Sequence, residues 1–355
     1  MGQILNHAGH EHVEMFEDPK SRLKAVIALH STRLGPAAGG CRLWAYACPD
    51  GAVADALRLS RGMSYKNAMA GLPLGGGKSV IMRPEGPFDR AALFRAFGDA
   101  VESLQGRYLT AEDVGTSIPD MEVVRGRTRF VAGLSAKPGR AGGDPSPWTA
   151  LGVFNCMKLA VARKLGRGMD GVSVAVQGVG HVGLILARLL HKEGARLVIA
   201  DADWDRARGV AAELDATLAE PGDVLAADVD VVAPCALGGV LDERAIAAMR
   251  ARIVCGAANN QLASDADAEA LRHRDILYAP DYVVNAGGII NVTCEFLGEG
   301  QDRVESRMAR MPLRLNCIFD RAETKSVSPA VIADEMAREL IQNTKRVPHD
   351  TRVAS

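Results

Sequence analysis

Two lysines, Lys66 and Lys78, stand twelve residues apart in the chain, with no other charged residue between them. Lys66 lies in RGMSYKNAMAG, whose apolar and small residues have helical spacing, and Lys78 directly follows the glycines Gly75–Gly77. Because glycines carry no side chain, they let the backbone approach a ligand and leave Lys78 unobstructed. A lysine in a cleft can hold a carboxylate or act as a base, whereas the ordinary alternative is a surface lysine whose stem packs on apolar neighbours.

The segment PLGGGKS around Lys78 also invites comparison with a phosphate-binding P-loop. That motif requires a glycine five residues before the glycine that precedes the lysine, and position 72 is a leucine. The P-loop interpretation therefore fails.

A second glycine motif lies in the middle of the chain and has the form G-x-G-x-x-G. Its residues are Gly178, Val179, Gly180, His181, Val182 and Gly183. It directly follows the strand-like run SVAVQ and opens the amphipathic run HVGLILARLLHKEG, a context that predicts a pyrophosphate site at a helix N-terminus. Outside such a context, the same glycines could be a structural turn.

Asp201 follows the next strand-like run, 23 residues after Gly178. A carboxylate there can accept hydrogen bonds from ribose hydroxyls and would repel a 2′-phosphate, which predicts NAD rather than NADP as the cofactor. The alternative is that Asp201 only caps the segment that follows it. Arg206 and Arg208 are close enough in sequence that the use of both NAD and NADP stays open.

Two kinds of element pattern divide the chain. From about Met169, short β-rich runs alternate with helical ones, which predicts βαβ units and a parallel, doubly wound sheet. These runs cover residues 173–177, 196–200, 229–233, 252–256 and 276–279. The earlier part mixes a strand, LKAVIALH, with helical patterns over 53–72 and 91–104.

The predicted fold is therefore α/β with two domains separated by a cleft. We expect an N-terminal mixed α/β substrate domain at 1–140 and a Rossmann-type dinucleotide-binding domain at 141–325. A C-terminal helical segment, 326–355, should begin after Ser328 as N-cap with Pro329 at the first position and pack back on one of the domains. Lys137–Pro147, rich in Gly and Pro, is the predicted hinge.

Composition narrows the function further. The 355 residues are 48% hydrophobic and 24% charged, and 42 basic residues face 43 acidic ones, so the chain has no basic excess for nucleic acid or a membrane surface. Its seven cysteines form no C-x-x-C pair and the first residues lack a signal-peptide pattern, so we expect a cytoplasmic protein. His7, His10 and His12 have no carboxylate or cysteine framework, and we predict no metal site.

Several segments together resemble one family, the leucine/phenylalanine/valine dehydrogenases, which are relatives of glutamate dehydrogenase. The resemblance runs in order from about Leu23 to beyond Val292. Its segments are GPAAGGCRLW (35–44), RGMSYKNAMAGLPLGGGKSV (61–80), GRYLTAEDVGT (106–116), VQGVGHVG (176–183), APCALGG (233–239), GAANNQL (256–262) and APDYVVNAGGIINV (279–292).

The resemblance implies a role for each matching residue. Lys66 would bind the substrate α-carboxylate, assisted by backbone near Gly39 and Gly40. Lys78 would be the general base that activates water, and Asp113 would exchange protons with the amine. Hydride transfer leaves an iminium that water must attack, so a base that is partly neutral near pH 7 is needed, and a second lysine nearby would favour that form.

The resemblance also implies contacts to the cofactor or its neighbourhood. Thr149 would lie near the nicotinamide carboxamide, and Ala236 and Leu237 near the ribose. Asn259 and Asn285 would contact cofactor or substrate, although an asparagine taken alone is more often a turn residue. The resemblance further implies a homo-oligomer that acts on a small-molecule substrate.

The substrate is expected to be an apolar L-amino acid. Where glutamate-specific relatives carry a lysine and a serine, this chain has Ala38 and Val292, so a substrate carboxylate would be buried unpaired. Ala38 leaves room for a longer or aromatic side chain, whereas Ala111, Ile289 and Val292 favour an aliphatic one. We expect a branched-chain substrate, leucine first, with phenylalanine as the alternative.

Two other functions stay open at this point. A short-chain or hydroxy-acid dehydrogenase could use the same scaffold, but would place its dinucleotide motif near the start of the chain or use a different base. A non-catalytic NAD-binding sensor would keep 178–183 and tolerate the loss of Lys66, Lys78 or Asp113, and all three are present.

Overall fold

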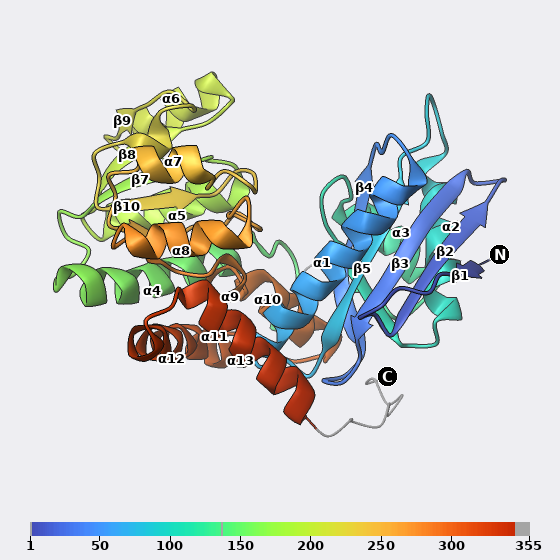
Figure 1. Cartoon of the computed structure of the whole chain (residues 1–355). Coiled ribbons are helices and arrows are strands. Elements are labelled where there is room, and N and C mark those ends of the chain that lie inside the picture. Colours follow the sequence, from blue (N-terminus) through green and yellow to red (C-terminus); the bar gives the residue numbers. More distant parts are fainter. Residues whose placement is uncertain (1, 136–137, 345–355) are drawn as a thin grey trace. The chain divides into compact units, whose positions relative to one another are not determined.

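The structure is a computed structural model that describes residues 2–135 and 138–344 (Figure 1). The described residues form two compact units. Of the described residues, unit 1 contains those up to Asp144, Ile289–Glu305 and those from Ala337 to residue 344, and unit 2 contains Pro145–Gly288 and Ser306–Met336. Lys137, at the start of the predicted hinge, and residues 345–355 of the predicted last segment lie outside the described residues.

Unit 1 is built on a mixed sheet with the strand order β1-β2-β3-β5-β4-β6. The strands are β1 (Gly2–Ile4), β2 (His12–Asp18), β3 (Leu23–Ser31), β4 (Ala37–Trp44), β5 (Gly75–Met82) and β6 (Tyr108–Glu112). β4 pairs in parallel with both β5 and β6, whereas β3 pairs antiparallel with β5. The carboxyl ends of β5, β4 and β6 therefore lie at one edge of the sheet.

Helices cover both faces of this sheet (Figure 1). They are α1 (Pro49–Met69), α2 (Arg90–Ser103) and α3 (Ile118–Arg125). Side chains alternate between the faces of a strand, so Val80 packs beneath α1 while Ile81 packs with Phe94 and Phe97 beneath α2. Burying each such side chain contributes roughly 1.5 to 3 kcal/mol.

Glycines allow α1 to lie very close to β5. A Cβ atom at Gly76 would lie 2.0 Å from the backbone nitrogen of Ser64, so only glycine fits beneath the helix there. The Asn67 amide on the next turn donates a hydrogen bond of 2.6 Å to the Gly75 carbonyl. The GGG run before Lys78 thus has a packing role as well as leaving that lysine unobstructed.

The helix α10 (Gly287–Phe296) is tied to unit 1 from Ile289 onward. The buried Asn291 amide exchanges hydrogen bonds with both backbone groups of Gly142, and Glu295 accepts from the backbone N–H groups of Gly133 and Leu134. These contacts place residues 289–305 with the N-terminal part of the chain, whereas the predicted ranges group them with the dinucleotide domain.

Unit 2 contains an all-parallel sheet with the strand order β12-β11-β10-β7-β8-β9. Its strands are β7 (Ser173–Gln177), β8 (Arg196–Ala200), β9 (Thr217–Leu218), β10 (Val231–Pro234), β11 (Ile253–Val254) and β12 (Leu277–Tyr278). β7 is the first of these strands in sequence and lies in the centre of the sheet. β8 and β9 follow on one side of it and β10, β11 and β12 on the other, so the strand order reverses between β7 and β10. Ligands of such sheets bind at the carboxyl ends of the strands at this reversal.

The remaining helices connect these strands or follow them. In unit 2 they are α4 (Ser146–Leu165), α5 (His181–Lys192), α6 (Trp204–Glu213), η1 (Val224–Ala226), α7 (Glu243–Ala248), α8 (Asp265–His273), α9 (Asp281–Val284) and α12 (Arg310–Lys325). α11 (Gln301–Met308) and α13 (Pro329–Asn343) each begin in one unit and end in the other. None of the helices within 2–135 and 138–344 is long and apolar enough to span a membrane.

Candidate active site

The structure brings Lys78 and Asp113 into direct contact. Lys78 lies on β5 two residues before Val80 and so projects from the face that α1 covers, and Asp113 directly follows β6. The Lys78 Nζ atom is 2.8 Å from Oδ2 of Asp113, and their side chains are 6% and 22% exposed. The two residues therefore form a shielded ion pair at the edge where β5, β4 and β6 end.

Asp113 is held in its ionised form by its surroundings. Burial alone would raise the pKa of this carboxyl, but the attraction of Lys78 and then of Arg42 outweighs it, so the pKa lies below its usual value. The Asp113 backbone N–H donates to Thr116 Oγ1 at 2.8 Å, and that hydroxyl donates to the Cys41 carbonyl. This turn fixes the position of the Asp113 carboxylate directly after β6.

Glycines on β4 make room for the ion pair. Gly40 pairs with Ala111 on β6, and a Cβ atom there would lie 2.7 Å from Cβ of Asp113 and 3.3 Å from Nζ of Lys78. A Cβ atom at Gly39 would meet the Gly77 carbonyl at 1.8 Å. Neither position tolerates a side chain without movement of the strands.

The other residues predicted for substrate binding have these positions in unit 1. Lys66 is half-buried near the end of α1, the helix that covers the face from which Lys78 projects. Ala38 on β4 and Ala111 on β6 are 1% and 7% exposed. On α10, Val292 is buried and Ile289 is half-buried.

Arg42 is a functional candidate that the sequence analysis did not single out. Its guanidinium lies between two carboxylates, with Nη1 2.8 Å from Asp55 on α1 and Nε 3.3 Å from Asp113. The available signal was the alternation along β4, which puts Arg42 on the same face as Gly40, between the buried Cys41 and Leu43. Asp55 lies 58 positions before Asp113 in the sequence, so its link to the site could be found only from the fold.

In unit 2, the glycine motif forms the turn between β7 and α5. Gly178 has φ +92°, a left-handed backbone conformation that favours glycine, and a Cβ atom there would lie 2.7 Å from Cβ of Ala236. A Cβ atom at Gly183 would lie 1.9 Å from the Gly178 carbonyl. Val179 is buried, Gly180 is the N-cap of α5, and His181 and Val182 begin the helix, so backbone N–H groups of the first turn can face an anion.

Asp201 follows β8 and supports this turn. Its Oδ2 atom accepts a 2.8 Å hydrogen bond from the Val179 backbone N–H, and its Oδ1 atom accepts one from Asp203. Arg206 Nη1 lies 3.5 Å from Oδ2. The N-cap of α6 is Asp203, through the Arg206 backbone N–H, whereas Asp201 binds the backbone of Asp203 just before the helix, so Asp201 supports both this segment and the glycine turn.

The other residues predicted near the cofactor lie around the same strand ends or at the start of α4. Ala236 and Leu237 are exposed after β10. The Asn285 amide donates to Asn259 Oδ1 at 2.9 Å, and the buried Asn285 Oδ1 has no hydrogen-bond partner within the described part of the chain. Thr149 lies on the first turn of α4, where its hydroxyl donates to the Pro145 carbonyl.

These features fit a dinucleotide. The carboxyl ends of β7 and β10 carry a cradle of glycines that a Cβ atom would fill, the start of a helix, and a carboxylate after the adjacent β8.

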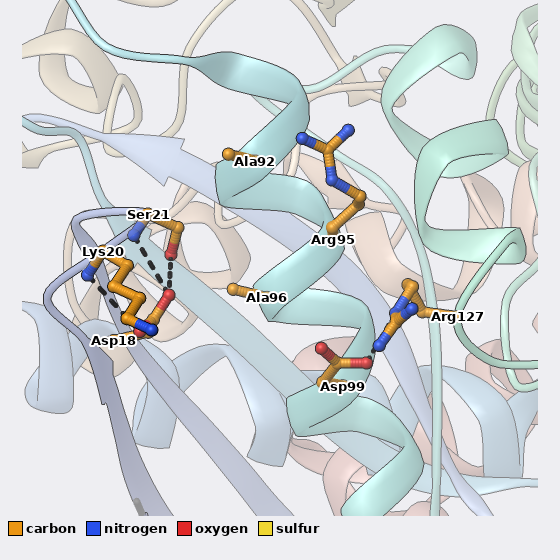
Figure 2. Close-up of a pocket in the computed structure, with 8 residues that line it drawn as sticks. All are labelled: Asp18, Lys20, Ser21, Ala92, Arg95, Ala96, Asp99 and Arg127. Atoms are coloured by element: carbon orange, nitrogen blue, oxygen red, sulfur yellow. Dashed lines mark hydrogen bonds and ion pairs between the residues drawn. The ribbon is translucent and has the colours of Figure 1, made fainter.

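A surface hollow of about 340 Å³ in unit 1 is separate from these residues (Figure 2). Its carboxylates are already engaged, Asp18 with Ser21 and Asp99 with Arg127 at 2.7 Å. Within the described ranges, no group of three or more His, Cys, Asp or Glu side chains could hold a metal ion.

Comparison with known proteins identifies the family. Residues 9–130 match the dimerisation domain of the Glu/Leu/Phe/Val dehydrogenases, and residues 205–331 match the Glutamate/Leucine/Phenylalanine/Valine dehydrogenase model. Leucine dehydrogenase from Thermoactinomyces intermedius is 42% identical over 95% of this chain and 92% of its own length. Valine dehydrogenase from Streptomyces virginiae is 44% identical over 96% of each chain.

A solved structure agrees with these matches. The crystal structure of L-tryptophan dehydrogenase from Nostoc punctiforme superposes with a TM-score of 0.82 at 40% identity, covering 96% of this chain and 98% of that one. The predicted family and the predicted two-domain α/β fold are both confirmed. The chain belongs to the Glu/Leu/Phe/Val dehydrogenase family and is an amino-acid dehydrogenase.

Proposed function

We propose that this protein catalyses the reversible, NAD-dependent oxidative deamination of an apolar L-amino acid to the 2-oxo acid and ammonia, with leucine as preferred substrate. The observation that carries the proposal is the shielded Lys78–Asp113 pair at 2.8 Å. An amine and a carboxylate in hydrogen-bond contact can take and return the protons that such a reaction moves.

Each charged residue has one task in this reaction. Lys66 binds the substrate α-carboxylate, with backbone near Gly39 and Gly40. Asp113 takes a proton from the substrate ammonium and returns it to the nitrogen when ammonia leaves. Lys78 in its neutral form removes a proton from water.

The order of bond changes follows from these tasks. When bound, the nicotinamide cofactor would supply the hydride acceptor for the substrate Cα, so that the substrate is left with a carbon–nitrogen double bond. Lys78 deprotonates the water that adds to this carbon, and Asp113 then protonates the nitrogen. Asp113, now a carboxylate again, accepts the hydroxyl proton as the carbonyl forms, the carbon–nitrogen bond breaks and ammonia departs.

The choice of NAD rests on unit 2. Gly178, Gly180 and Gly183 admit a pyrophosphate close to the backbone, and Asp201 would accept hydrogen bonds from the ribose hydroxyls and repel a 2′-phosphate. Thr149, Asn259 and Asn285 supply polar groups for the nicotinamide end.

The apolar substrate class rests on Ala38, Ala111, Ile289 and Val292, because none of them can pair with a substrate side-chain carboxylate. A second candidate is an aromatic amino acid. It is favoured by the small Ala38 and by the similarity to the L-tryptophan dehydrogenase of Nostoc punctiforme, which is 41% identical over 97% of both chains. The matched dimerisation domain supports a homo-oligomer.

The test is NAD reduction by the purified protein with a panel of L-amino acids: leucine, valine, phenylalanine, tryptophan and glutamate. We expect the highest kcat/KM with leucine and the lowest with glutamate. A higher kcat/KM with phenylalanine or tryptophan would select the aromatic candidate. Binding of NAD without turnover of any amino acid would instead support a non-catalytic NAD sensor.

A further inference from the structure

Arg42 connects α1 to the carboxylate of Asp113. Its Nη1 atom donates to Asp55 Oδ2 at 2.8 Å, and its Nε atom donates to Asp113 Oδ2 at 3.3 Å. The side chain is 22% exposed. A guanidinium stays charged at every pH at which proteins are folded, so this bridge is permanent.

Asp55 fixes the position of Arg42 from the helix side. Oδ2 of Asp55 also accepts from the Tyr46 hydroxyl at 2.6 Å, and Oδ1 accepts from Arg58 at 2.9 Å. Burial would raise the pKa of Asp55, but the hydrogen bonds from Tyr46 and Arg58 and the charge of Arg42 lower it below its usual value. Asp55 is therefore an ionised anchor on α1.

On the sheet side, Arg42 and Lys78 share one oxygen. Oδ2 of Asp113 receives both Lys78 Nζ at 2.8 Å and Arg42 Nε at 3.3 Å. A carboxylate paired with Lys78 alone would hold the lysine proton tightly. With Arg42 on the same oxygen, Asp113 keeps a cationic partner after Lys78 loses its proton.

We propose that Arg42 is a positioning residue that orients Asp113 and, by its fixed charge on the shared carboxylate oxygen, favours the transfer of the Lys78 proton. This rests on the proposed function, in which Lys78 is the base that activates water. Arg42 is not assigned a contact with the substrate.

The groups around Asp113 come from several elements. Lys78 on β5 and Arg42 on β4 contact its carboxylate, and Arg42 links it to Asp55 on α1, whose other partners are Tyr46 and Arg58. Cys41 on β4 lies near enough for its thiol to be influenced by Asp113 and by Asp120 of α3, which is paired with Arg90 of α2. Burial raises the pKa of the Cys41 thiol to about 12, and burial together with Asp55 raises the pKa of Tyr46. Both stay neutral between pH 6 and about 10, so neither can produce the pH response assigned to Lys78.

The test compares three variants of the full chain. Arg42→Met removes the charge while keeping length, and Arg42→Lys keeps a charge. Arg127→Met is the control, because it also removes an arginine from an ion pair, that with Asp99, on the opposite face of the sheet of unit 1. Each is assayed for kcat and KM with leucine and NAD from pH 6 to about 10.5.

We expect the acid side of the kcat profile of Arg42→Met to move to higher pH by about one unit, so that kcat at pH 7.5 falls about tenfold and recovers at high pH. Arg42→Lys should restore most of the shift, and Arg127→Met should match wild type. An unshifted profile for Arg42→Met, with or without a uniform loss of kcat, would overturn the proposal while the amino-acid dehydrogenase function stands.

A second measurement needs no turnover. Trace labelling with acetic anhydride, followed by mass spectrometry of the peptide that contains Lys78, reports the pH at which this amine becomes reactive. That pH should rise by about one unit in Arg42→Met and remain unchanged in Arg127→Met. If wild type oxidises no amino acid, the proposed function fails, and the labelling result alone then decides whether Arg42 controls the Lys78 proton.

Discussion

A Cβ atom at Gly40 would lie 2.7 Å from the Cβ of Asp113. The same atom would lie 2.8 Å from the Glu112 carbonyl oxygen and 3.3 Å from Lys78 Nζ. Because the nearest two contacts involve the chain at the end of β6, a side chain at position 40 would displace Asp113 rather than a flexible terminus. Glycine at this position therefore permits the Lys78–Asp113 contact.

Gly40→Ala should lower kcat/KM by about 100-fold, because a shift of about 1 Å in catalytic geometry costs on that order. The matched control is Gly62→Ala on the exposed side of α1, where an added Cβ meets nothing within 4 Å. The control should keep its activity and gain roughly 0.5 to 1 kcal/mol of stability from better helix propensity. Full activity in a folded Gly40→Ala protein would show that the contact is not needed for turnover.

Local sequence patterns predicted much of unit 2. The runs 173–177 and 196–200 coincide with β7 and β8, because short β-rich segments bounded by glycine and charge are strong strand signals. β11 and β12 are only two residues each within the longer predicted runs, since strand ends depend on pairing with neighbours. No helix was predicted over 301–325, where α11 and α12 form. α11 contains few apolar residues, but the buried residues of α12, Met311, Leu315, Ile318, Phe319 and Ala322, recur at helical spacing, so α12 could have been predicted from the sequence.

The site was predictable only in part. The glycine motif, Lys78 and Asp113 could be identified from the sequence alone. Which side chains contact Asp113 depends on how β4 pairs with β5 and β6. Arg42 reaches Asp55 on α1 and Asp113 after β6, and no local pattern brings those three positions together. The packing of α1 against glycines was likewise visible only once the strands were paired.

His30 should make the fold sensitive to mild acid. Burial, reinforced by the positive charges of His10 and Arg61, lowers the pKa of His30 from 6.5 to about 4. The unfolded chain therefore binds a proton more readily than the folded one, so stability that is present above pH 6.5 is lost as pH falls toward 4. His30 also hydrogen-bonds Ser64 at 2.8 Å and packs edge to face on His10.

Thermal unfolding of wild type and His30→Gln at pH 7.5 and pH 5.0, at one protein concentration, checks this. The drop in Tm between the two pH values should be several degrees smaller in the variant. His191→Gln, on the exposed surface of α5, should keep the wild-type drop. An equal drop in His30→Gln would mean that other groups cause the acid sensitivity.

Asp201→Ser should relax the cofactor preference. Removing the carboxylate removes its repulsion of a 2′-phosphate and leaves Arg206 nearby, so kcat/KM with NADP relative to NAD should rise about tenfold or more. Asp205→Ser, at a side chain on α6 that is 91% exposed, is the control and should leave the ratio unchanged. Wild-type protein that already used NADP as well as NAD would contradict the role given to Asp201.

The proposed role of Ala38 and Val292 in selecting an apolar substrate is tested by Ala38→Lys combined with Val292→Ser. Both positions are buried, so the new ammonium should lower kcat/KM with leucine strongly while glutamate oxidation rises only a little. Ala54→Lys, at an exposed position on α1, controls for the addition of a lysine. Equal wild-type activity on glutamate and leucine would show that Ala38 and Val292 do not select the substrate.

The most direct test of the catalytic account is Lys78→Ala, assayed for kcat/KM with leucine and, separately, for NADH binding by fluorescence. Lys24→Ala, at an exposed position of β3, is the matched control. The account predicts a loss of about 10² to 10⁴-fold in kcat/KM for Lys78→Ala, with the Kd for NADH nearly unchanged, and wild-type values for Lys24→Ala. Near-normal turnover in a Lys78→Ala protein that still binds NADH would contradict the assignment of Lys78 as the base.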